Sequence, residues 1–543
     1  MDVWFSFIIQ LHRQFFIRRF RQKFINLERS LLNPHFCFMP TTPTLDSCAP
    51  KSSTENPSTE KDGATTSTFL AAAATLPFSS RSTTTAARSM TSVITLDGSY
   101  GEGGGQILRN GISLATILGV PLQIDRIRAR RSHPGLKAQH VASVELPVRL
   151  VSNNDSCSSS TSTSTTSGSL LQGNHLRSTT IVFTPSDDDD NPPARERHLT
   201  QKIGTAGSIC LLLQAALPVA LFGKAPVHLT LGGGTNATMA PQYDYWHEVF
   251  LPTLQEQFGG GNLSSLLFGI TAQVKQRGYF PKGGGQVVVH VKQPLRTNQT
   301  LQPIQLIDRG NAVRQLRIRA FCAGRWKEKD AKVMVQAARD FLQQHQPELL
   351  TGRPQEGHVE TEIVTERNAV GSGMGILIIA TTDTGCRLAG SALCHQKQDG
   401  AAAGRAAANE LVQTWLDGGC VDEWLQDQFI LYMALAAGTS RMLTGSLTLH
   451  TQTAIWVAEQ LTGTRFRVQR LDSGNGNDSN GESKMTSSSS STDIRRGPAK
   501  RPKVNVRKRP PPNADYGTHG RIAGRHLIEC SGIGLKGRAS LEE

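Results

Sequence analysis

Apolar runs with the spacing of strands alternate with apolar patterns of helical spacing from residue 93 to residue 530. The strand-like runs are rich in β-branched and aromatic residues, whereas the helical patterns have apolar residues three or four positions apart. The strand-like runs are residues 93–97, 122–129, 180–184, 227–231, 286–291, 315–321, 375–380, 446–449, 466–471 and 526–530. The helical patterns are residues 106–118, 136–150, 208–222, 243–257, 329–344, 401–415, 425–436 and 451–461. Their alternation predicts layered strands and helices of the α/β or α+β class.

One helical pattern lies within an uncharged stretch, residues 203–223, that is long enough to cross a bilayer. Gln214 and Pro218 interrupt this stretch, and Gly204 and Gly207 weaken its start. We therefore expect a buried core helix and no membrane span.

Low-complexity stretches separate the ordered patterns. Residues 41–92 are crowded with Thr, Ser, Ala and Pro, and we expect them to be disordered. Residues 1–39 are apolar and Arg-rich, which suits either a mitochondrial transit peptide or an extension upstream of a start at Met90. Solvated insertions are expected at residues 152–173, 186–197 and 472–524.

Composition supports this division, because 38% hydrophobic and 6% aromatic residues lie below the usual globular range. The net charge of +14 is concentrated in residues 1–39 and in residues 495–509, which hold eight Lys or Arg and no acid. Such a basic run can bind nucleic acid or a nuclear import receptor, or it can simply be a solvated segment without a partner. The remaining chain is nearly neutral, so an anionic substrate must be bound by a local basic cluster.

The nine cysteines form no CxxC pair. This spacing argues against a cysteine-based zinc site and a disulfide scaffold, and it favours a reducing compartment.

The segment DGSYGEGGGQILR, residues 97–109, follows a strand-like run and opens a helical pattern. Its glycines let backbone N–H groups turn toward an anion, and a helix start adds partial positive charge. Glu102 can hold a hard divalent cation, while Gln106 and Arg109, one helical turn apart, can face a phosphate. The segment is neither a Walker loop nor a Rossmann fingerprint, and a tight turn with a surface acid is the alternative.

A basic cluster follows the next strand-like run, where Arg128, Arg130 and Arg131 precede Lys137 and His140. Bunched guanidinium groups suit phosphate because each planar fork binds two oxygens. No aromatic residue is interleaved, so base stacking is not implied, and an ordinary basic surface is the alternative.

His450 stands between a strand-like run and a helical pattern. A neutral imidazole can attack phosphorus and form a labile phosphoramidate that passes a nucleotidyl group on. The chain has 15 histidines, so this chemistry alone leaves a histidine satisfied by capping hydrogen bonds as the alternative.

Several of these segments together resemble one family, the RNA 3′-terminal phosphate cyclases. The segments that carry the resemblance are DGSYGEGGGQILR (97–109), IRARRSHPGLKAQH (127–140), TAGSICLLLQAALP (205–218), GGTNATMAPQYDY (233–245), RGYFPKGGGQV (277–287), VDEWLQDQFILYMALAAGTSR (421–441), LHTQTAIWVAEQ (449–460) and HLIECSGIGL (526–535). They occur in order over residues 93–535, broken by the three insertions.

The resemblance implies an α+β architecture with a large domain of three repeated units, each a four-stranded sheet with two helices. A smaller α/β domain is inserted into the large one. The expected organisation is an N-terminal extension over residues 1–91, the large domain over residues 92–300, 417–471 and 525–536, the inserted domain over residues 301–416, and the basic insertion over residues 472–524.

The resemblance also implies a reaction on RNA that ends in a 3′-phosphate. His450 would attack the α-phosphorus of ATP and carry AMP. The RNA 3′-phosphate would then accept the AMP, and the neighbouring 2′-hydroxyl would displace it, leaving a 2′,3′-cyclic phosphate. Adenylylation supplies a leaving group, and proximity makes ring closure effectively intramolecular.

Further site residues follow from the resemblance. Gln214 and Pro241 would line the nucleotide site, and Trp424, where the family usually has tyrosine, would stack on adenine. Glu102 would bind Mg²⁺ or Mn²⁺. The remaining expected contacts are Asp427 and Gln428 to the nucleotide, and Gln106, Arg109, Arg128, Arg131 and His140 to phosphates. Arg130 departs from the family, which commonly has glycine there, and its bulk can displace its neighbours.

Two alternatives accompany the enzyme hypothesis. A cyclase-like ribosome-assembly factor would lack the nucleophile that His450 supplies here, and enolpyruvyl transferases of related fold need no histidine–nucleotide intermediate. We expect a nuclear location from residues 495–509, with mitochondrial targeting by residues 1–39 as the other possibility.

Overall fold

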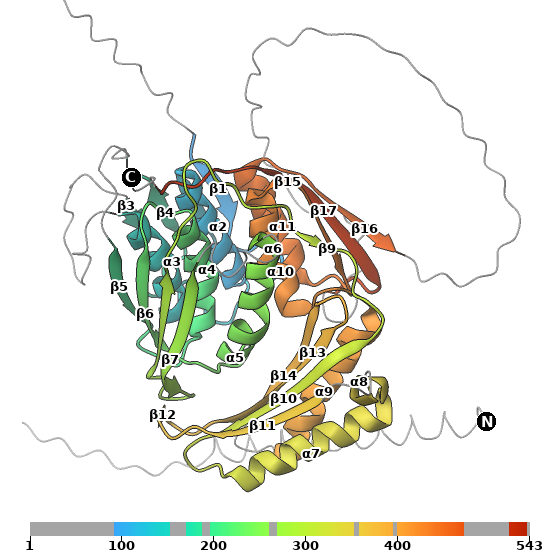
Figure 1. The fold of residues 1–543 in the computed structure, drawn as a ribbon. Helices are drawn as coiled ribbons and strands as arrows, with labels where there is room; N and C mark the ends of the chain where they lie inside the picture. Colours follow the sequence, from blue (N-terminus) through green and yellow to red (C-terminus); the bar gives the residue numbers. More distant parts are fainter. Residues whose placement is uncertain are drawn as a thin grey trace, which may run out of the picture. The chain divides into compact units, whose positions relative to one another are not determined.

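The structure is a computed structural model that describes residues 92–152, 170–186, 196–259, 269–351, 358–394, 399–471 and 521–539 (Figure 1). The expected extension over residues 1–91 and the basic run at residues 495–509 lie outside this part of the chain, so the hypotheses attached to them stay predictions.

A first sheet is built around one parallel pair of strands. Its elements are β1 (Ile94–Asp97), α2 (Gly105–Leu118), β2 (Leu122–Asp125), α3 (Ala138–Val151), β3 (Leu170–Gln172) and β4 (Ile181–Thr184). The strand order is β1-β2-β4-β3, with β1 parallel to β2 and the other pairs antiparallel. A parallel pair needs a crossover, and α2 supplies it. β3 falls within the Ser- and Thr-rich stretch expected to be an insertion.

The second sheet repeats this connectivity. Its elements are β5 (Arg197–Lys202), α4 (Ile209–Leu221), β6 (Val227–Gly233), α5 (Tyr243–Tyr245), the π-helical turn η1 (Trp246–Phe250), α6 (Leu251–Gly259), β7 (Ile270–Gly278) and β8 (Gly285–Val291). The strand order is β5-β6-β8-β7, and β12 (Ala369–Val370) adds to the β7 edge. Here α4 links the parallel strands β5 and β6.

The third sheet is made of segments on both sides of a long excursion of the chain. Its elements are β9 (Gln305–Leu306), α10 (Glu423–Leu435), β15 (Ala437–Thr444), α11 (Leu449–Thr462), β16 (Phe466–Leu471) and β17 (Arg525–Ile533). The order β9-β15-β17-β16, with β9 parallel to β15, matches the other two sheets. The expected α+β class, with mixed four-stranded sheets and helices, is confirmed.

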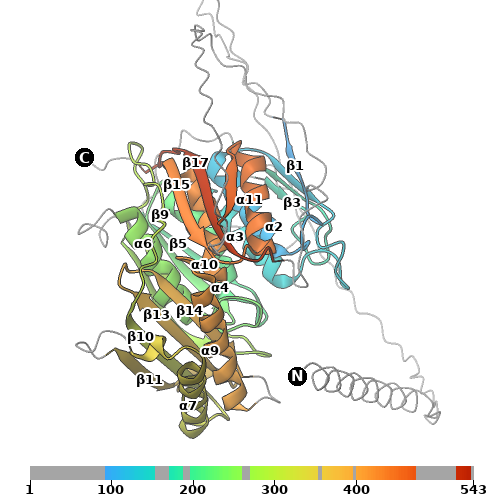
Figure 2. The same ribbon diagram turned by 90° about the vertical axis from the view of Figure 1, so that its right-hand side faces the viewer.

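The helices of the three sheets share one hydrophobic core. Ile112 of α2, Leu213 of α4 and Phe429 of α10 are fully buried members of the same cluster. α11 packs against both α2 and α10 (Figure 2), which brings the first and third units together. The uncharged stretch forms the buried helix α4 as expected, and none of the helices in the described ranges is both long and apolar enough to cross a membrane.

The excursion between β9 and α10 forms a separate sheet with its own core. Its elements are β10 (Val313–Cys322), α7 (Glu328–His345), α8 (Glu348–Thr351), β11 (Val359–Thr365), β13 (Met374–Thr382), β14 (Arg387–Leu393) and α9 (Gly400–Asp417). The order is β11-β10-β13-β14, with α7 and α9 packed on one face (Figure 1). All of β13 is buried, because the second unit covers the other face. β9 belongs to the third sheet, and the separate sheet begins with β10 at Val313, while the domain boundaries that the resemblance implies stay predictions.

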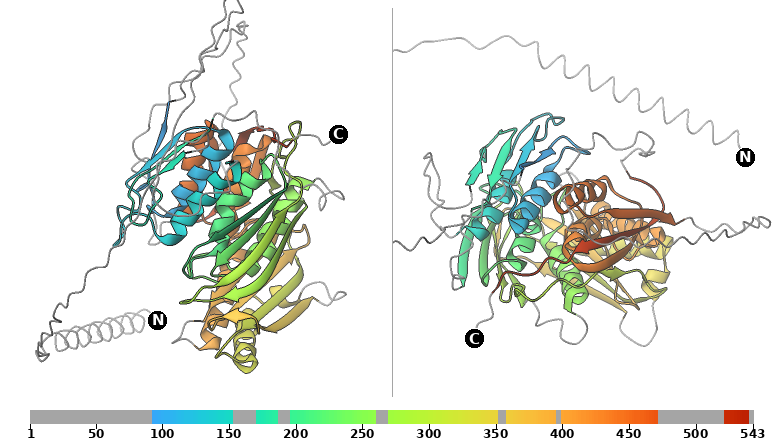
Figure 3. Two further views of the ribbon diagram at one scale, coloured as in Figure 1. Left: turned by 90° about the vertical axis from the view of Figure 1, so that its left-hand side faces the viewer. Right: turned by 90° about the horizontal axis from the view of Figure 1, so that it is seen from above.

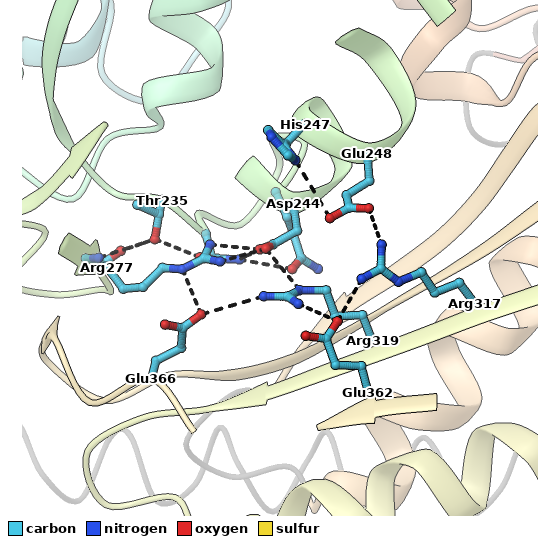
Figure 4. Close-up of polar contacts among 12 residues, drawn as sticks. Thr235, Asp244, His247, Glu248, Arg277, Arg317, Arg319, Glu362 and Glu366 are labelled. Carbon is cyan, nitrogen blue, oxygen red and sulfur yellow. Dashed lines mark hydrogen bonds and ion pairs between the residues drawn. The ribbon is translucent and has the colours of Figure 1, made fainter. Parts of the chain in front are cut away.

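Buried charges connect the inserted sheet to the second unit (Figure 4). Arg277, at the end of β7, donates to both oxygens of Asp244 at 2.7 and 2.9 Å and to Glu366 at 2.9 Å. Arg319 of β10 donates to Asp244 at 3.3 Å and to Glu362 at 2.6 Å. We call these five residues, with Arg317 and Glu248, the interdomain charge network.

One strand expectation is wrong. Residues 446–449 were expected as a strand before the helix of His450, but Thr448 is the N-cap of α11, and the strand is β15, which ends six residues upstream of His450. The N-cap hydroxyl satisfies a backbone N–H at the helix start, so Thr448 favours a helix boundary over an extended run.

Candidate active site

The glycine-rich segment after β1 lies directly against the start of α11. Gly101 and Gly103 have φ of +55° and +58°, which side chains other than glycine rarely adopt. A Cβ at Gly101 would lie 2.6 Å from Oγ1 of Thr453, so only glycine allows this approach. The close approach places Glu102 beside the first turn of α11.

His450 occupies the second position of α11, just after its N-cap. Thr448 Oγ1 accepts the N–H of Thr451 at 3.0 Å and fixes the helix start. His450 Nε2 lies 3.5 Å from Oε2 of Glu102, and Nη2 of Arg131 lies 3.5 Å from the same oxygen. The His450 side chain is 47% exposed, so a ligand can reach the imidazole. A helix N-terminus favours an anion at this point.

Gln426 of α10 holds the start of α11, a role that no motif in the sequence indicates. Its Oε1 accepts the N–H of Thr448 at 3.0 Å and the hydroxyl of Thr451 at 2.6 Å. Its Nε2 donates to Thr444 and to the carbonyl of Ser446. This fully engaged buried amide makes Gln426 a positioning residue for His450.

A second group of expected residues meets beneath the glycine-rich segment. Arg109 Nε donates to Oε1 of Gln214 at 2.6 Å, and its Nη2 donates to Oε1 of Gln106 at 2.9 Å. A Cβ at Gly105 would lie 2.7 Å from Nη1 of Arg109 and 2.9 Å from Nε2 of His140. Burial lowers the pKa of Arg109 to about 10, so its guanidinium is still charged at neutral pH.

His140 is a neutral donor in this group. Burial and the positive charges of Arg109, Arg128 and Lys137 lower its pKa to about 3. Nδ1 lies 3.1 Å from the N–H of Lys137, which donates to it, and this assigns the proton to Nε2. Nε2 therefore offers a hydrogen bond to an anion near Gly105 without adding charge.

Asp427 interacts with both groups of site residues, those around His450 and those around Arg109. Burial raises its pKa to about 6, while His450 and Arg109 oppose that rise. The Asp427 carboxylate therefore interacts electrostatically with both the exposed imidazole of His450 and the buried guanidinium of Arg109. Gln428, on the same helix, instead donates its amide to the carbonyl of Trp424 at 2.6 Å.

Arg128 holds its own loop. Its φ is +54°, and its Nη1 donates to the carbonyls of His133 and Gly135 at 2.7 and 2.8 Å. Burial and the charge of Arg131 lower its pKa. Arg130 is exposed and does not share this left-handed conformation, so the backbone at that position does not require glycine.

Trp424 and Pro241 lie in different parts of the fold. The indole of Trp424, in the first turn of α10, donates from Nε1 to Oε1 of Glu410 at 2.9 Å. The N-cap Asp422 accepts the N–H groups of Trp424 and Ala389 and so links α10 to the inserted sheet. Pro241 is buried in the loop between β6 and α5, three residues before Asp244 in the chain.

Replacing Glu410 by glutamine should make the free energy of unfolding less dependent on pH. Burial raises the pKa of Glu410 to about 7, although Ser391 and Trp424 donate to its carboxylate. A carboxyl whose pKa rises on folding stabilises the native state below its unfolded pKa, and this stability is lost as pH rises through the folded pKa. Between pH 5 and 8 the free energy of unfolding of the native chain should therefore fall by about 1–3 kcal/mol more than that of the variant. Urea unfolding at both pH values tests this, and identical losses in both proteins would contradict it.

The arrangement suits chemistry on phosphate esters that requires a divalent cation. The Glu102 carboxylate is half-buried and only loosely paired, which fits a hard ion such as Mg²⁺ that takes one or two protein carboxylates and completes its shell with phosphates and water. The nearby groups add an exposed imidazole, two arginines and a helix start.

Comparisons with known proteins point to one family. A family model described as RNA 3′-terminal phosphate cyclase matches residues 100–468. The chain is similar to an RNA 3′-terminal phosphate cyclase of Drosophila melanogaster, with 37% identity over 69% of this chain and 92% of the relative. It is similar to a probable cyclase of Dictyostelium discoideum, with 33% identity over 69% of this chain and 78% of the relative. A cyclase of Pyrobaculum neutrophilum is 31% identical over 69% of this chain and 95% of the relative.

Proposed function

The chain belongs to the RNA 3′-terminal phosphate cyclase family, and from this premise we propose that it converts the 3′-terminal phosphate of RNA to a 2′,3′-cyclic phosphodiester with ATP. The observation that carries the proposal is the exposed imidazole of His450 at the start of α11, 3.5 Å from Glu102. The enzyme is then a ligase that forms a phosphoric ester bond.

The first step transfers AMP to the protein. Nε2 of His450 attacks the α-phosphorus of ATP, the bond from that phosphorus to the bridging oxygen breaks, and pyrophosphate leaves. The product is a phosphoramidate in which His450 carries AMP. Gln426 supports this step by fixing the turn that presents the imidazole.

The next steps pass AMP to RNA and release it. An oxygen of the RNA 3′-phosphate attacks the α-phosphorus, the phosphorus–nitrogen bond breaks, and a phosphoanhydride forms. The ribose 2′-hydroxyl then attacks the 3′-phosphorus, loses its proton, and displaces AMP. Both groups sit on one ribose, so ring closure is intramolecular.

The residues around His450 suit the charges of these steps. Arg109, Arg131 and the Nε2–H of His140 would bind phosphate oxygens, with Gln106 and Gln214 orienting Arg109. Glu102 would hold Mg²⁺ or Mn²⁺, which neutralises charge on the triphosphate. Arg128 contributes mainly by shaping the loop that carries Arg131.

A cyclase-like assembly factor without activity is the competing hypothesis, and a direct assay separates the two. The full chain, ATP and a divalent metal are incubated with an oligoribonucleotide that ends in a 3′-phosphate. We expect the terminal phosphate to become resistant to phosphatase because it has cyclised. A terminal phosphate that stays sensitive to phosphatase after incubation with the full chain, ATP and metal would favour the assembly factor.

Replacing Trp424 by alanine should raise the KM for ATP, because we propose that the indole stacks on adenine. Stacking of a base on an aromatic side chain contributes about 1–3 kcal/mol, so the expected increase is roughly 5- to 150-fold. Trp424→Tyr keeps an aromatic face and should stay near the native KM. Initial rates against ATP concentration measure both variants, and an unchanged KM in the alanine variant would refute the stacking.

We also propose that residues 495–509 direct the chain to the nucleus through an import receptor. A fluorescent fusion lacking residues 472–520 should leave the nucleus while the purified variant still cyclises RNA. Nuclear retention of that fusion would remove the proposal, and a large loss of turnover would place the segment in the active site.

A further inference from the structure

Three histidines lie side by side on adjacent strands of the second sheet (green strands in Figure 3, left). His198 of β5 is opposite His228 of β6, and His228 is opposite His290 of β8. The flanking residues Val227 and Val291 are buried on the helix side of the sheet. Because side chains alternate between faces along a strand, the three imidazoles share the face away from α4.

Glu196, immediately before β5, closes this row. Its Oε1 lies 2.7 Å from Nε2 of His228 and 2.8 Å from Nε2 of His290. The rings of His228 and His290 stack with centroids 3.6 Å apart, and His198 stacks on His228 at 4.6 Å. The carboxylate oxygen and the two nitrogens all lie within 4.8 Å of one another.

These three atoms have the chemistry of metal ligands. Nε2 of His290 is shielded from solvent and makes no hydrogen bond of regular geometry, although the carboxylate is close. Two nitrogens and one carboxylate oxygen suit Zn²⁺ and similar ions, whereas Mg²⁺ prefers oxygen alone.

To hold an ion, the carboxylate must move outward and the two stacked imidazoles must rotate so that their Nε2 atoms converge on it. Zinc binds imidazole nitrogen and carboxylate oxygen at about 2.0–2.2 Å, which sets tetrahedral ligand atoms roughly 3.3–3.5 Å apart. The Glu196 oxygen, now 2.7 and 2.8 Å from the two nitrogens, must therefore move away from them by about 0.5–0.8 Å. Its side chain is 42% exposed, so a rotation suffices, and a water can complete the shell.

We propose that Glu196, His228 and His290 bind a divalent transition-metal ion, with Zn²⁺ the best fit, at a site separate from Glu102 and His450. The ion would join the start of β5 to β6 and β8. β5 leads through residues 203–208 into α4, which carries Gln214, so the ion would brace the strand that precedes this helix. The proposal does not depend on the reaction proposed above.

Zinc titration of the full chain, after chelator treatment, tests the site by calorimetry. His290→Gln removes a ligand, and His175→Gln, at an exposed histidine elsewhere, is the matched control. Loss of a residue that only orients a metal ligand typically weakens affinity 10- to 100-fold, so loss of a ligand should cost at least tenfold. We expect that loss, or the disappearance of one equivalent of zinc, in His290→Gln and in His228→Gln alone.

A second readout separates binding from misfolding. Zinc should raise the melting temperature of the native chain and of His175→Gln, and it should leave that of His290→Gln unchanged, while the circular dichroism of all three agrees without zinc. Equal zinc affinity and stoichiometry in His290→Gln and the native chain would overturn the proposal, as would native zinc binding with no effect on melting. Cyclisation with Mg²⁺ should persist in His290→Gln, which keeps this test distinct from that of the proposed function.

Discussion

Replacing His450 by asparagine should abolish the retention of AMP on the protein and lower the rate of cyclisation on the order of 10⁴–10⁶-fold. Loss of the nucleophile removes the covalent step entirely, while the surrounding phosphate ligands keep their positions. The His450 side chain is half-exposed at a helix start, and Thr448 and Gln426 cap and hold that start without it. The fold should therefore survive the change.

Incubation with α-labelled ATP and a divalent metal measures the first step directly. The native chain should retain acid-labile label, and so should His175→Asn, which removes an exposed imidazole elsewhere. Label retained by His450→Asn at the native level would mean that another group carries AMP. No label on the native chain would end the covalent mechanism.

Local patterns sufficed to predict the elements that present the nucleophile. The helices that became α2 and α11 have apolar positions at helical spacing, and the glycines after β1 mark a close approach that only glycine permits. His450, Glu102 and Arg131 were linked by resemblance, and the structure brings His450 and Arg131 each to 3.5 Å from the carboxylate of Glu102.

Other parts of the site depend on contacts between distant segments. β15 carries few apolar residues and is a strand because it pairs with β17, about 90 residues later. Gln426 and Glu410 are polar residues inside helical patterns, where a sequence offers no sign of their partners. The row of histidines is visible only through strand register, since neighbours on one sheet face lie far apart in sequence.

Replacing Arg277 by methionine should lower the free energy of unfolding by about 3–5 kcal/mol. The side chains of Arg277 and Asp244 are 7% and 6% exposed, so little water can compensate. The interdomain charge network holds four carboxylates and three arginines, and this change leaves two negative charges in excess. Burial would raise the pKa of Asp244, but Arg277 and Arg319 hold it below its usual value. Without Arg277, the buried carboxylate of Asp244 keeps only Arg319 as a neighbouring positive charge in the network.

A second ion pair between the inserted sheet and the second unit is more exposed, and comparison with it tests whether burial causes this loss. Arg387 of β14 makes two bonds of 2.6 Å to Glu256 of α6, but Glu256 is 49% exposed. Arg387→Met should therefore cost about 1 kcal/mol or less.

The double variant Arg277→Met, Asp244→Asn removes one charge of each sign and should recover part of the loss, because the uncompensated carboxylate is gone. Denaturant unfolding of five proteins measures these differences: the native chain, Arg277→Met, Asp244→Asn, Arg387→Met and the double variant. Equal losses for Arg277→Met and Arg387→Met would show that the buried network stabilises the junction no more than an exposed ion pair does. Losses that simply add in the double variant would show that Arg277 and Asp244 act independently, in spite of their two shared hydrogen bonds.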